Sequence, residues 1–341
     1  MDAFEERLAP YDYVLPESLI ARYPSERRDG GRLLVVGSEE NDHRRIRDLP
    51  DFLDAGDVLV VNDTRVMPAR VACRRSSGGS VEGLFLEEGA QEARALLRPS
   101  RRLRVGEVLS VGDHTIELME KRDGGEWGVR CSCLAAELMA AHGEMPLPPY
   151  MRRSAGLEDK ERYQTIFAAK SGAVAAPTAS LHLTEEGIGN LEGKGVRVAK
   201  ITLHVGIGTF RNLRPEDLQQ GRLHPEWYSV PEDTVDAIRN CRRLGGRVVA
   251  VGTTVARTLE SATPENHRVP RAGEDVTRLF LREGASFRCV DGLMTNFHLP
   301  RSSLLMLVCA FGGRKRILSA YQDAIQENYR FYSYGDSMLI L

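Results

Sequence analysis

Three stretches of apolar residues in this chain each end in a short cluster of polar residues and glycines. They read DVLVVNDTR (57–65), ITLHVGIGTFR (201–211) and VVAVGTTVART (248–258). β-Branched residues follow one another in them without alternation, which predicts strands buried on both faces. Such strands belong to the interior of an α/β sheet or barrel, where ligands bind beyond the carboxyl ends of the strands. Three strands that deliver polar residues to one end are typical of an enzyme.

The region between Val66 and Pro149 has a different pattern. Short runs of about four to seven residues alternate partly between apolar and polar positions, and turn-forming residues such as Pro99 and Gly112 separate them. Several short strands at near-regular spacing predict a small antiparallel barrel. We therefore predict an α/β (α+β) main domain with a mixed sheet or barrel-like core, made of residues 1–65 and 150–341. An inserted small antiparallel β-barrel domain occupies residues 66–149.

Helices and further strands are predicted around this framework. The segment 231–246 has a proline and acidic residues at its start, arginines in its last turn and glycines after it, which indicates a helix. Further helices are predicted at 17–23, 158–170 and 315–328, and strands at 33–36 and in the final SMLIL.

Composition narrows the class of protein. The 341 residues carry 46 basic and 48 acidic side chains, so any nucleic-acid surface must be local. No apolar stretch approaches the roughly 18 residues of a membrane span, and no secretory signal is visible. Six cysteines suggest reduced thiols in a cytoplasm. Cys131 and Cys133 lack a second pair of ligands, so no metal site is expected.

Several short motifs hold candidate chemistry, and each also has a purely structural interpretation. Asp63 and Arg65 follow a buried strand together with Asn62; they either act on a ligand or form an internal ion pair. His204 precedes Gly206 and Gly208, a weak phosphate-binding signal, and it could equally be a hydrogen-bonded core histidine.

Two other segments place histidines near small residues or a proline. The first, AAPTASLHLTEE (175–186), contains Thr178 and His182 and ends in what resembles a helix N-terminus, but it could be a plain loop with a capping threonine. The second, NFHLP (296–300), contains Asn296 and His298 and could be a simple turn. Arginine-rich runs are candidates for binding phosphate, or are solvated loops. They contain Arg27, Arg28 and Arg32 near the N-terminus and Arg101 and Arg102 in the insert.

Ten segments in order resemble one family, the S-adenosylmethionine:tRNA ribosyltransferase-isomerases of queuosine biosynthesis. The similarity extends from about Tyr11 to Leu341 and is thinnest in the insert. The segments are YDYVLPESLIARYPSERRDGGRLLVV, DVLVVNDTRVMPAR, LPPYMRR, DKERYQTIFA, GAVAAPTASLHLTEE, ITLHVGIGTFR, GRLHPEWYSVP, VVAVGTTVARTLES, VDGLMTNFHLPRSSLLMLVCAF and YRFYSYGDSMLIL.

This resemblance implies transfer and isomerisation of the ribosyl part of S-adenosylmethionine onto 7-aminomethyl-7-deazaguanine. The acceptor is the wobble base of tRNA with a GUN anticodon, and the products are epoxyqueuosine-tRNA, adenine and methionine. S-adenosylmethionine is then a co-substrate, and its sulfonium acidifies the adjacent 5′-hydrogen without a metal. A cytoplasmic monomer with no membrane contact is expected.

The resemblance also suggests roles for individual residues. The candidates for acid or base are His204, His182 and Asp63, with no firm assignment among them. Arginines would orient the methionine carboxylate or tRNA phosphates. The expected substrate-binding residues are Asn62, Arg65, Thr178, Gly206, Gly208, Arg211, Thr253, Thr254, Arg257, Asn296 and His298.

The chain departs from the usual family pattern at a few positions. Ser180 and Leu183 stand where the family usually has glycine and phenylalanine, and Val255-Ala256 where it has serine and valine. Arg278 replaces an aspartate and reverses a charge. Two other functions are compatible with the residues alone: a non-catalytic RNA-binding protein and a tRNA methyltransferase using the same cofactor.

Overall fold

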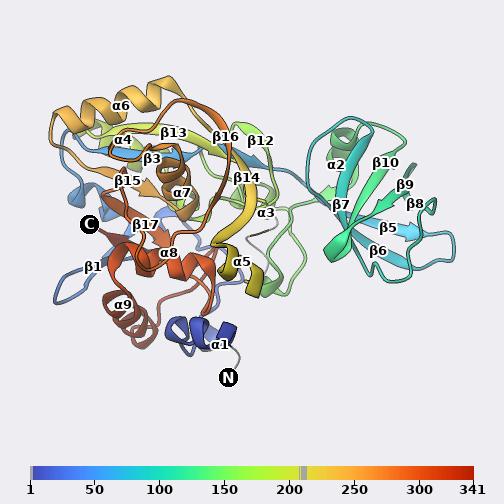
Figure 1. The fold of residues 1–341 in the computed structure, drawn as a ribbon, viewed down its shortest axis with the longest axis horizontal. Helices are drawn as coiled ribbons and strands as arrows, with labels where there is room; N and C mark the ends of the chain where they lie inside the picture. The colour runs from blue at the N-terminus through green and yellow to red at the C-terminus, as the bar shows by residue number, and fades with distance from the viewer. Residues whose placement is uncertain (1–2, 207, 209–212) are drawn as a thin grey trace.

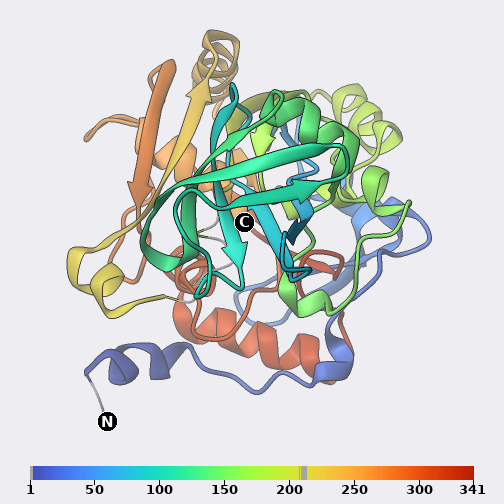
Figure 2. The same cartoon turned by 90° about the vertical axis from the view of Figure 1, so that its right-hand side faces the viewer.

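The computed structural model describes residues 3–206, 208 and 213–341. A large sheet covered by helices forms the main body, and a small barrel projects from one side of it (Figure 1). Turned by 90°, the barrel lies in front of the main body (Figure 2). This arrangement confirms the predicted combination of an α/β core and a small antiparallel barrel.

Within the described residues, nine strands form the main sheet in the order β16-β14-β13-β3-β15-β17-β18-β1-β2. Four neighbours in its centre, β13, β3, β15 and β17, run parallel, so their carboxyl ends lie at one edge. The strands are β1 (Arg32–Val36), β2 (Asp42–Arg45), β3 (Val58–Asn62), β13 (Arg197–Leu203), β14 (Arg222–Val230), β15 (Val248–Val251), β16 (Gly273–Leu279), β17 (Gly292–Asn296) and β18 (Ser337–Ile340).

Both faces of this sheet are covered, as the continuous apolar runs predict. On one face, Val58 and Val60 of β3 belong to an apolar cluster with residues of α6 (Glu232–Arg243), α7 (Thr253–Ala262), α8 (Ser303–Gly312) and α9 (Arg314–Gln326). On the other face, Leu59 and Val61 pack with α4 (Glu185–Gly193) and the 3-10 turn Ile46–Phe52. Every residue of β3 is buried for this reason.

The barrel closes because β5 pairs with both β6 and β8. Its strands are β5 (Arg70–Arg75), β6 (Ser80–Phe85), β7 (Glu92–Arg98), β8 (Val108–Val111), β9 (His114–Lys121) and β10 (Glu126–Cys131), and β11 (Gly143–Glu144) adds to β5. Alternate residues point inward around Trp127, which is fully buried. Helix α2 (Ala135–His142) packs against β5 and β11. This strand pairing is compatible with an inserted domain of residues 66–149, and these domain boundaries stay a prediction.

Shorter elements connect these parts. The helices are α1 (Ala3–Leu8), α3 (Asp159–Arg162) and α5 (Pro215–Gln220), and β12 (Lys170–Ala173) pairs in parallel with β4 (Thr64–Val66).

Two predicted helices are wrong. Residues 17–23 form only a 3-10 turn, Glu17–Leu19, because Ile20 instead bridges Phe331. The segment 158–170 is helical only over α3. After it, Tyr163 and Phe167 turn into two different apolar clusters, which a continuous helix could not reach together.

Candidate functional site

A cavity of about 350 Å³ opens at the carboxyl ends of β15 and β17. We call it the strand-end cavity. Its lining includes seven of the residues singled out from the sequence: Thr178, Gly208, Thr253, Thr254, Arg257, Asn296 and His298. The volume lies within the range typical of small-molecule sites. Residues from four distant parts of the chain therefore meet where the sequence predicts a ligand.

Helix α7 begins at the wall of this cavity. Gly252, between β15 and α7, has φ 97° and provides no side-chain cap, so the first N–H groups of the helix are left for other acceptors. Thr254 lines the cavity from the first turn, and its Oγ1 is buried without a hydrogen-bond partner.

Arg257 lies one turn further along α7. It is 5% exposed and forms an ion pair with Glu226 of β14, which is equally buried. The Nε atom of Arg257 donates to the carbonyl of Leu279 at 3.1 Å, and Oε1 of Glu226 accepts from the N–H of Gly206 at 3.0 Å. These bonds fix the guanidinium against the cavity wall.

Aromatic side chains form another part of the wall. Tyr150 stacks at a tilt on Tyr332, with ring centroids 4.6 Å apart, and its hydroxyl is hydrogen-bonded to Ser333. Burial raises the pKa of Tyr150 to about 12, so its hydroxyl stays protonated near neutral pH. Tyr332 has φ 73°, a strained conformation for a bulky residue and one that recurs at ligand sites.

His298 is the only candidate histidine among the described residues that lines the cavity. Its Nε2 atom is hydrogen-bonded to Oγ1 of Thr295 at 2.8 Å. Burial lowers the pKa of His298 to about 3, so the ring is neutral at pH 7.

His182 lies behind the cavity wall. Its Nε2 contacts Nδ2 of Asn296 at 3.1 Å, and Oδ1 of Asn296 accepts from Oγ1 of Thr178 at 2.8 Å. Burial lowers the pKa of His182 to about 4, although the charge of Asp336 acts in the opposite direction. A chain of hydrogen bonds therefore joins His182 to two residues of the cavity lining.

His204 occupies a separate position at the end of β13. It is half-buried, stacks on Trp227 with ring centroids 4.8 Å apart and is hydrogen-bonded through Nδ1 to Oγ1 of Thr64 at 2.8 Å. Its pKa is lowered, mainly by burial, while Asp63 acts in the opposite direction. Gly172 lies so close that a Cβ added there would be 2.8 Å from Nε2.

The polar residues at the end of β3 and in β4 are engaged with neighbouring segments of the chain. Asn62 is fully buried and exchanges hydrogen bonds with the backbone of Leu203. Asp63 accepts from Oγ1 of Thr202 at 2.6 Å, and Arg65 donates to the carbonyl of Ala168 at 2.6 Å. The alternative of an Asp63–Arg65 ion pair does not occur between these two described side chains.

The arginine-rich segments differ in their contacts. Arg27 pairs with Asp29, Arg28 donates to three backbone carbonyls, and Arg32 donates to the carbonyl of Glu327 while lying over the ring of Tyr329. Arg101 and Arg102 are exposed in the turn between β7 and β8. Arg211 falls outside the described residues.

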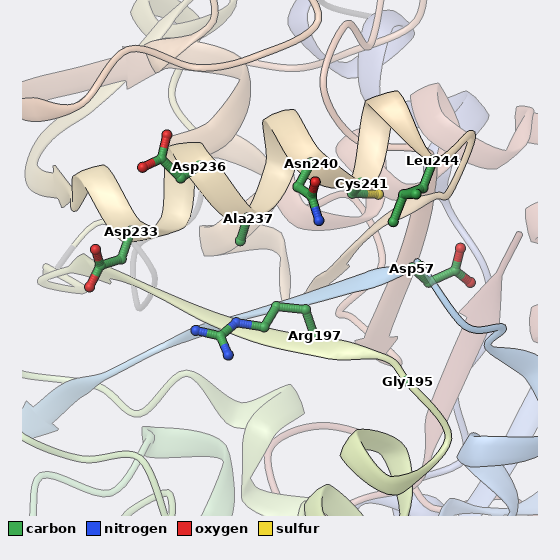
Figure 3. Close-up of a pocket in the computed structure, with 10 residues that line it drawn as sticks. Asp57, Gly195, Arg197, Asp233, Asp236, Ala237, Asn240, Cys241 and Leu244 are labelled. Atoms are coloured by element: carbon green, nitrogen blue, oxygen red, sulfur yellow. The ribbon is translucent and has the colours of Figure 1, made fainter.

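A larger cavity, of about 570 Å³, lies at the opposite edge of the sheet, between α6 and the start of β3 and β13. Figure 3 shows Asp233, Asp236 and Asn240 along the helix above Arg197 of β13. Ligand sites of parallel sheets lie at the carboxyl ends of the strands, so we place the candidate site in the strand-end cavity.

Sequence reasoning missed Tyr150, Tyr332, Ser333 and Glu226. Tyr150 follows the PLPP segment and Glu226 lies in HPEW, and neither motif by itself indicates chemistry. Their contribution depends on contacts across 183 and 31 residues of sequence, respectively. In the described part of the chain, no group of three or more His, Cys, Asp or Glu side chains could hold a metal ion, and no helix is long and apolar enough to cross a membrane.

Comparison with known proteins identifies close relatives. The profile of a family described as "Queuosine biosynthesis protein" matches residues 8–340. An S-adenosylmethionine:tRNA ribosyltransferase-isomerase from Gloeobacter violaceus is 48% identical, covering 97% of this chain and 95% of the relative. A protein of the same name from Anaeromyxobacter dehalogenans is 47% identical over 98% and 99% of the two chains. The crystal structure of an S-adenosylmethionine tRNA ribosyltransferase from Thermotoga maritima aligns with a TM-score of 0.56 and 34% identity, covering 97% of this chain and 100% of that one.

Proposed function

This chain belongs to the queuosine biosynthesis protein family, and we propose that it is an S-adenosylmethionine:tRNA ribosyltransferase-isomerase. It transfers the ribosyl part of S-adenosylmethionine to 7-aminomethyl-7-deazaguanine at the wobble position of tRNA with a GUN anticodon. Adenine and methionine leave, and the transferred sugar is isomerised to give epoxyqueuosine-tRNA. We further propose that the protein acts as a cytoplasmic monomer without a metal.

The strand-end cavity is the observation that supports this chemistry best. It combines aromatic walls, an uncapped helix N-terminus and a neutral histidine in about 350 Å³. An aromatic wall suits a purine or deazapurine ring, and a helix N-terminus suits a carboxylate. Both groups occur in the two substrates.

The reaction needs a base that removes the 5′-proton next to the sulfonium. His204 meets the requirement, because its lowered pKa keeps it neutral and its Nε2 has no hydrogen-bond partner among the described residues. We assign the role of base to His204, whose chain neighbour Val205 lines the strand-end cavity, so this role requires the imidazole to reach the substrate's 5′-carbon from the end of β13. Thr64 holds the other ring nitrogen, and Trp227 supports the ring face.

The other two candidates then have supporting roles. His182 accepts a hydrogen bond from Asn296 and orients its amide toward the cavity, so it is a positioning residue. Asp63 lies near His204 and favours its protonated form, which stabilises the imidazolium after proton removal. His298 is neutral inside the cavity, and because its Nε2 is bonded to Thr295, Nδ1 is the ring nitrogen that can form a hydrogen bond with the departing adenine.

tRNA is bound by a local basic surface, because the whole chain has a net charge of -2. Arg101 and Arg102 on the barrel are exposed and are the stronger candidates. The wobble base is presented in a single-stranded loop, so it can unstack and enter a pocket.

The direct test is product analysis. The full chain is incubated with S-adenosylmethionine and tRNA that carries the aminomethyl-deazaguanine, with unmodified tRNA as the control. We expect adenine and methionine in equal amounts, only with the modified tRNA, and no change after chelator treatment. S-adenosylhomocysteine with adenine still attached would indicate a methyltransferase, and tRNA binding without products would indicate a non-catalytic RNA-binding protein.

A further inference from the structure

Three donor groups converge at the start of α7 without a protein acceptor among the described residues. The first N–H groups of the helix have no side-chain cap, Oγ1 of Thr254 is buried without a partner, and so is Nη2 of Arg257. Thr254 and Arg257 lie three residues apart, so they share one side of the helix and line the same cavity. Buried polar atoms without partners are costly, and their concentration here points to a ligand that supplies acceptors.

Arg257 is held in one orientation by its other contacts. Nη1 pairs with Glu226 and Nε donates to the carbonyl of Leu279, which leaves Nη2 as the remaining donor group. Arg257 is buried, with 5% of its surface exposed, so a ligand that reaches Nη2 meets a guanidinium that is already desolvated and oriented. Little side-chain entropy is then lost on binding.

The N-terminus of a second helix adds to the positive electrostatic potential in the cavity. Helix α8 begins with Ser303, and Ser302 caps it by accepting from the N–H of Leu305 at 3.2 Å. Ser302 and Ser303 both line the strand-end cavity. The positive ends of two ten-residue helices therefore face one cavity, which favours an anion there.

We infer that this cluster, formed by Thr254, Arg257 and the N-terminus of α7, binds the carboxylate of the methionine part of S-adenosylmethionine. A carboxylate offers two oxygens in one plane, which suits a fixed guanidinium on one side and N–H and O–H donors on the other. The inference rests on the proposed function. It also sets the orientation of the bound substrate: the aminoacyl end lies at α7, and the adenosyl part extends toward Tyr150 and Tyr332.

Glu226 acts here as a positioning residue. Its carboxylate holds Arg257 and also accepts the N–H of Gly206, two residues after His204. The same strand presents Trp227 to the imidazole of His204. Glu226 and Trp227, adjacent residues of β14, thus contact Arg257 and His204 respectively. The same strand therefore positions both the carboxylate site and the proposed base.

The test compares two ligands by equilibrium binding without tRNA. S-adenosylmethionine is measured against its decarboxylated analogue, in which a hydrogen replaces the carboxylate. The parent chain is expected to prefer S-adenosylmethionine on the order of 10- to 100-fold, because charge-assisted hydrogen bonds are lost in the analogue. This preference is expected to fall at least several-fold in Thr254→Val. The same fall is expected in the double variant Arg257→Gln, Glu226→Gln, in which both charges are removed so that neither is left buried and unpaired. Thr254→Ser restores it, and Arg239→Gln on the exposed face of α6 is the matched control.

Three results would overturn the inference in distinguishable ways. A preference that is unchanged in Thr254→Val and in the double variant means that the carboxylate binds elsewhere. If these variants bind S-adenosylmethionine as the parent does but bind tRNA more weakly and with a weaker salt dependence, the cluster holds a phosphate. A parent chain that binds neither small ligand, and releases no adenine with modified tRNA, contradicts the proposed function itself.

Discussion

Nε2 of His182 accepts a hydrogen bond from Nδ2 of Asn296 over 3.1 Å. The direction follows from the neighbouring contact, because Oδ1 of Asn296 is occupied by the hydroxyl of Thr178 and its amide nitrogen can only donate. His182 must therefore be neutral with its proton on Nδ1. Protonation of Nε2 would break the chain of hydrogen bonds that orients Asn296 in the cavity.

The lowered pKa of His182 predicts that acid destabilises the protein. Its pKa is about 4 in the folded chain against 6.5 when unfolded, so the unfolded state binds the extra proton in this window. The contribution of His182 to the free energy of unfolding is therefore fully present above pH 6.5 and is lost as the pH falls toward 4. Between pH 7 and pH 5 the free energy of unfolding decreases by about 2 kcal/mol through His182.

Urea unfolding at both pH values measures this effect. His182→Gln keeps a hydrogen-bond acceptor but cannot titrate, so we expect a smaller loss of stability between pH 7 and pH 5 than in the parent. The exposed His267 provides the control His267→Gln, for which the pH dependence should equal that of the parent. An equal pH dependence in His182→Gln and the parent contradicts the prediction.

The assignment of His204 as the base predicts a specific kinetic pattern. His204→Ala should lower kcat on the order of 10²-fold or more, with nearly unchanged affinity for S-adenosylmethionine and little change in melting temperature. A core histidine would give the reverse: a lower melting temperature and folded protein that remains active.

Gly172 gives an independent test of the same residue. A Cβ at this position would be 2.8 Å from Nε2 of His204, so Gly172→Ala must displace the imidazole. The glycine also has φ 142°, which strains any other residue, and stability is therefore measured on each sample. Gly172→Ala should reduce kcat in the parent but cause little further loss in His204→Ala. Additive losses in the double variant would show that the two residues act independently.

The sequence predicts the central sheet well because burial on both faces demands uninterrupted apolar residues. The runs at β3 and β15 have this pattern, and the structure confirms both as buried parallel strands. The barrel strands are also visible in the sequence, since strands such as β6 and β8 alternate between an inward and an outward face. Local pattern and tertiary environment agree in these elements.

The side-chain geometry of the candidate site is less predictable. The sequence places His182, His204 and His298 at ends of strands or loops, but it does not indicate which way each ring turns. Only His298 lines the strand-end cavity, because the other two rings are held by Asn296 and by Thr64 and Trp227. The hydrogen bonds to Asn296 and Thr64 join residues 114 and 140 apart in sequence, beyond the reach of local patterns.

One departure from the family pattern has a predicted effect on stability. Ser180 is fully buried, and its Oγ has no hydrogen-bond partner among the described residues. Ser180→Ala removes this unpaired hydroxyl and should raise the free energy of unfolding by about 1 kcal/mol, measured by urea unfolding. The control has the opposite sign: Ser302→Ala removes the cap of α8 and should lower the same quantity by about 1 kcal/mol. A lower stability of Ser180→Ala would contradict the prediction.

Arg28 is expected to stabilise the fold and not to bind tRNA. Its guanidinium donates to the carbonyls of Glu161, Gln164 and Leu181, which ties the N-terminal segment to two later ones. Arg28→Gln should lower the free energy of unfolding by about 1 to 3 kcal/mol and leave the salt dependence of tRNA binding unchanged. Unfolding curves and a salt titration on the same preparation measure both quantities. A less steep salt dependence with unchanged stability would instead assign Arg28 to the tRNA surface.

Arg101 and Arg102 should show the opposite behaviour. Both are exposed in the turn between β7 and β8, so reversing their charges should not affect folding. Each phosphate contact contributes about 0.7 to 0.9 to the slope of the logarithm of affinity against the logarithm of salt concentration. Arg101→Glu with Arg102→Glu should therefore weaken tRNA binding and reduce the slope by up to about 1.4 to 1.8. Affinity for S-adenosylmethionine should not change, because its proposed site lies in the main body.

The matched control reverses two exposed arginines of the main body, Arg243 and Arg271, and so alters the net charge equally. Equal losses in both double variants would reflect bulk charge alone and would remove the barrel turn from the tRNA surface.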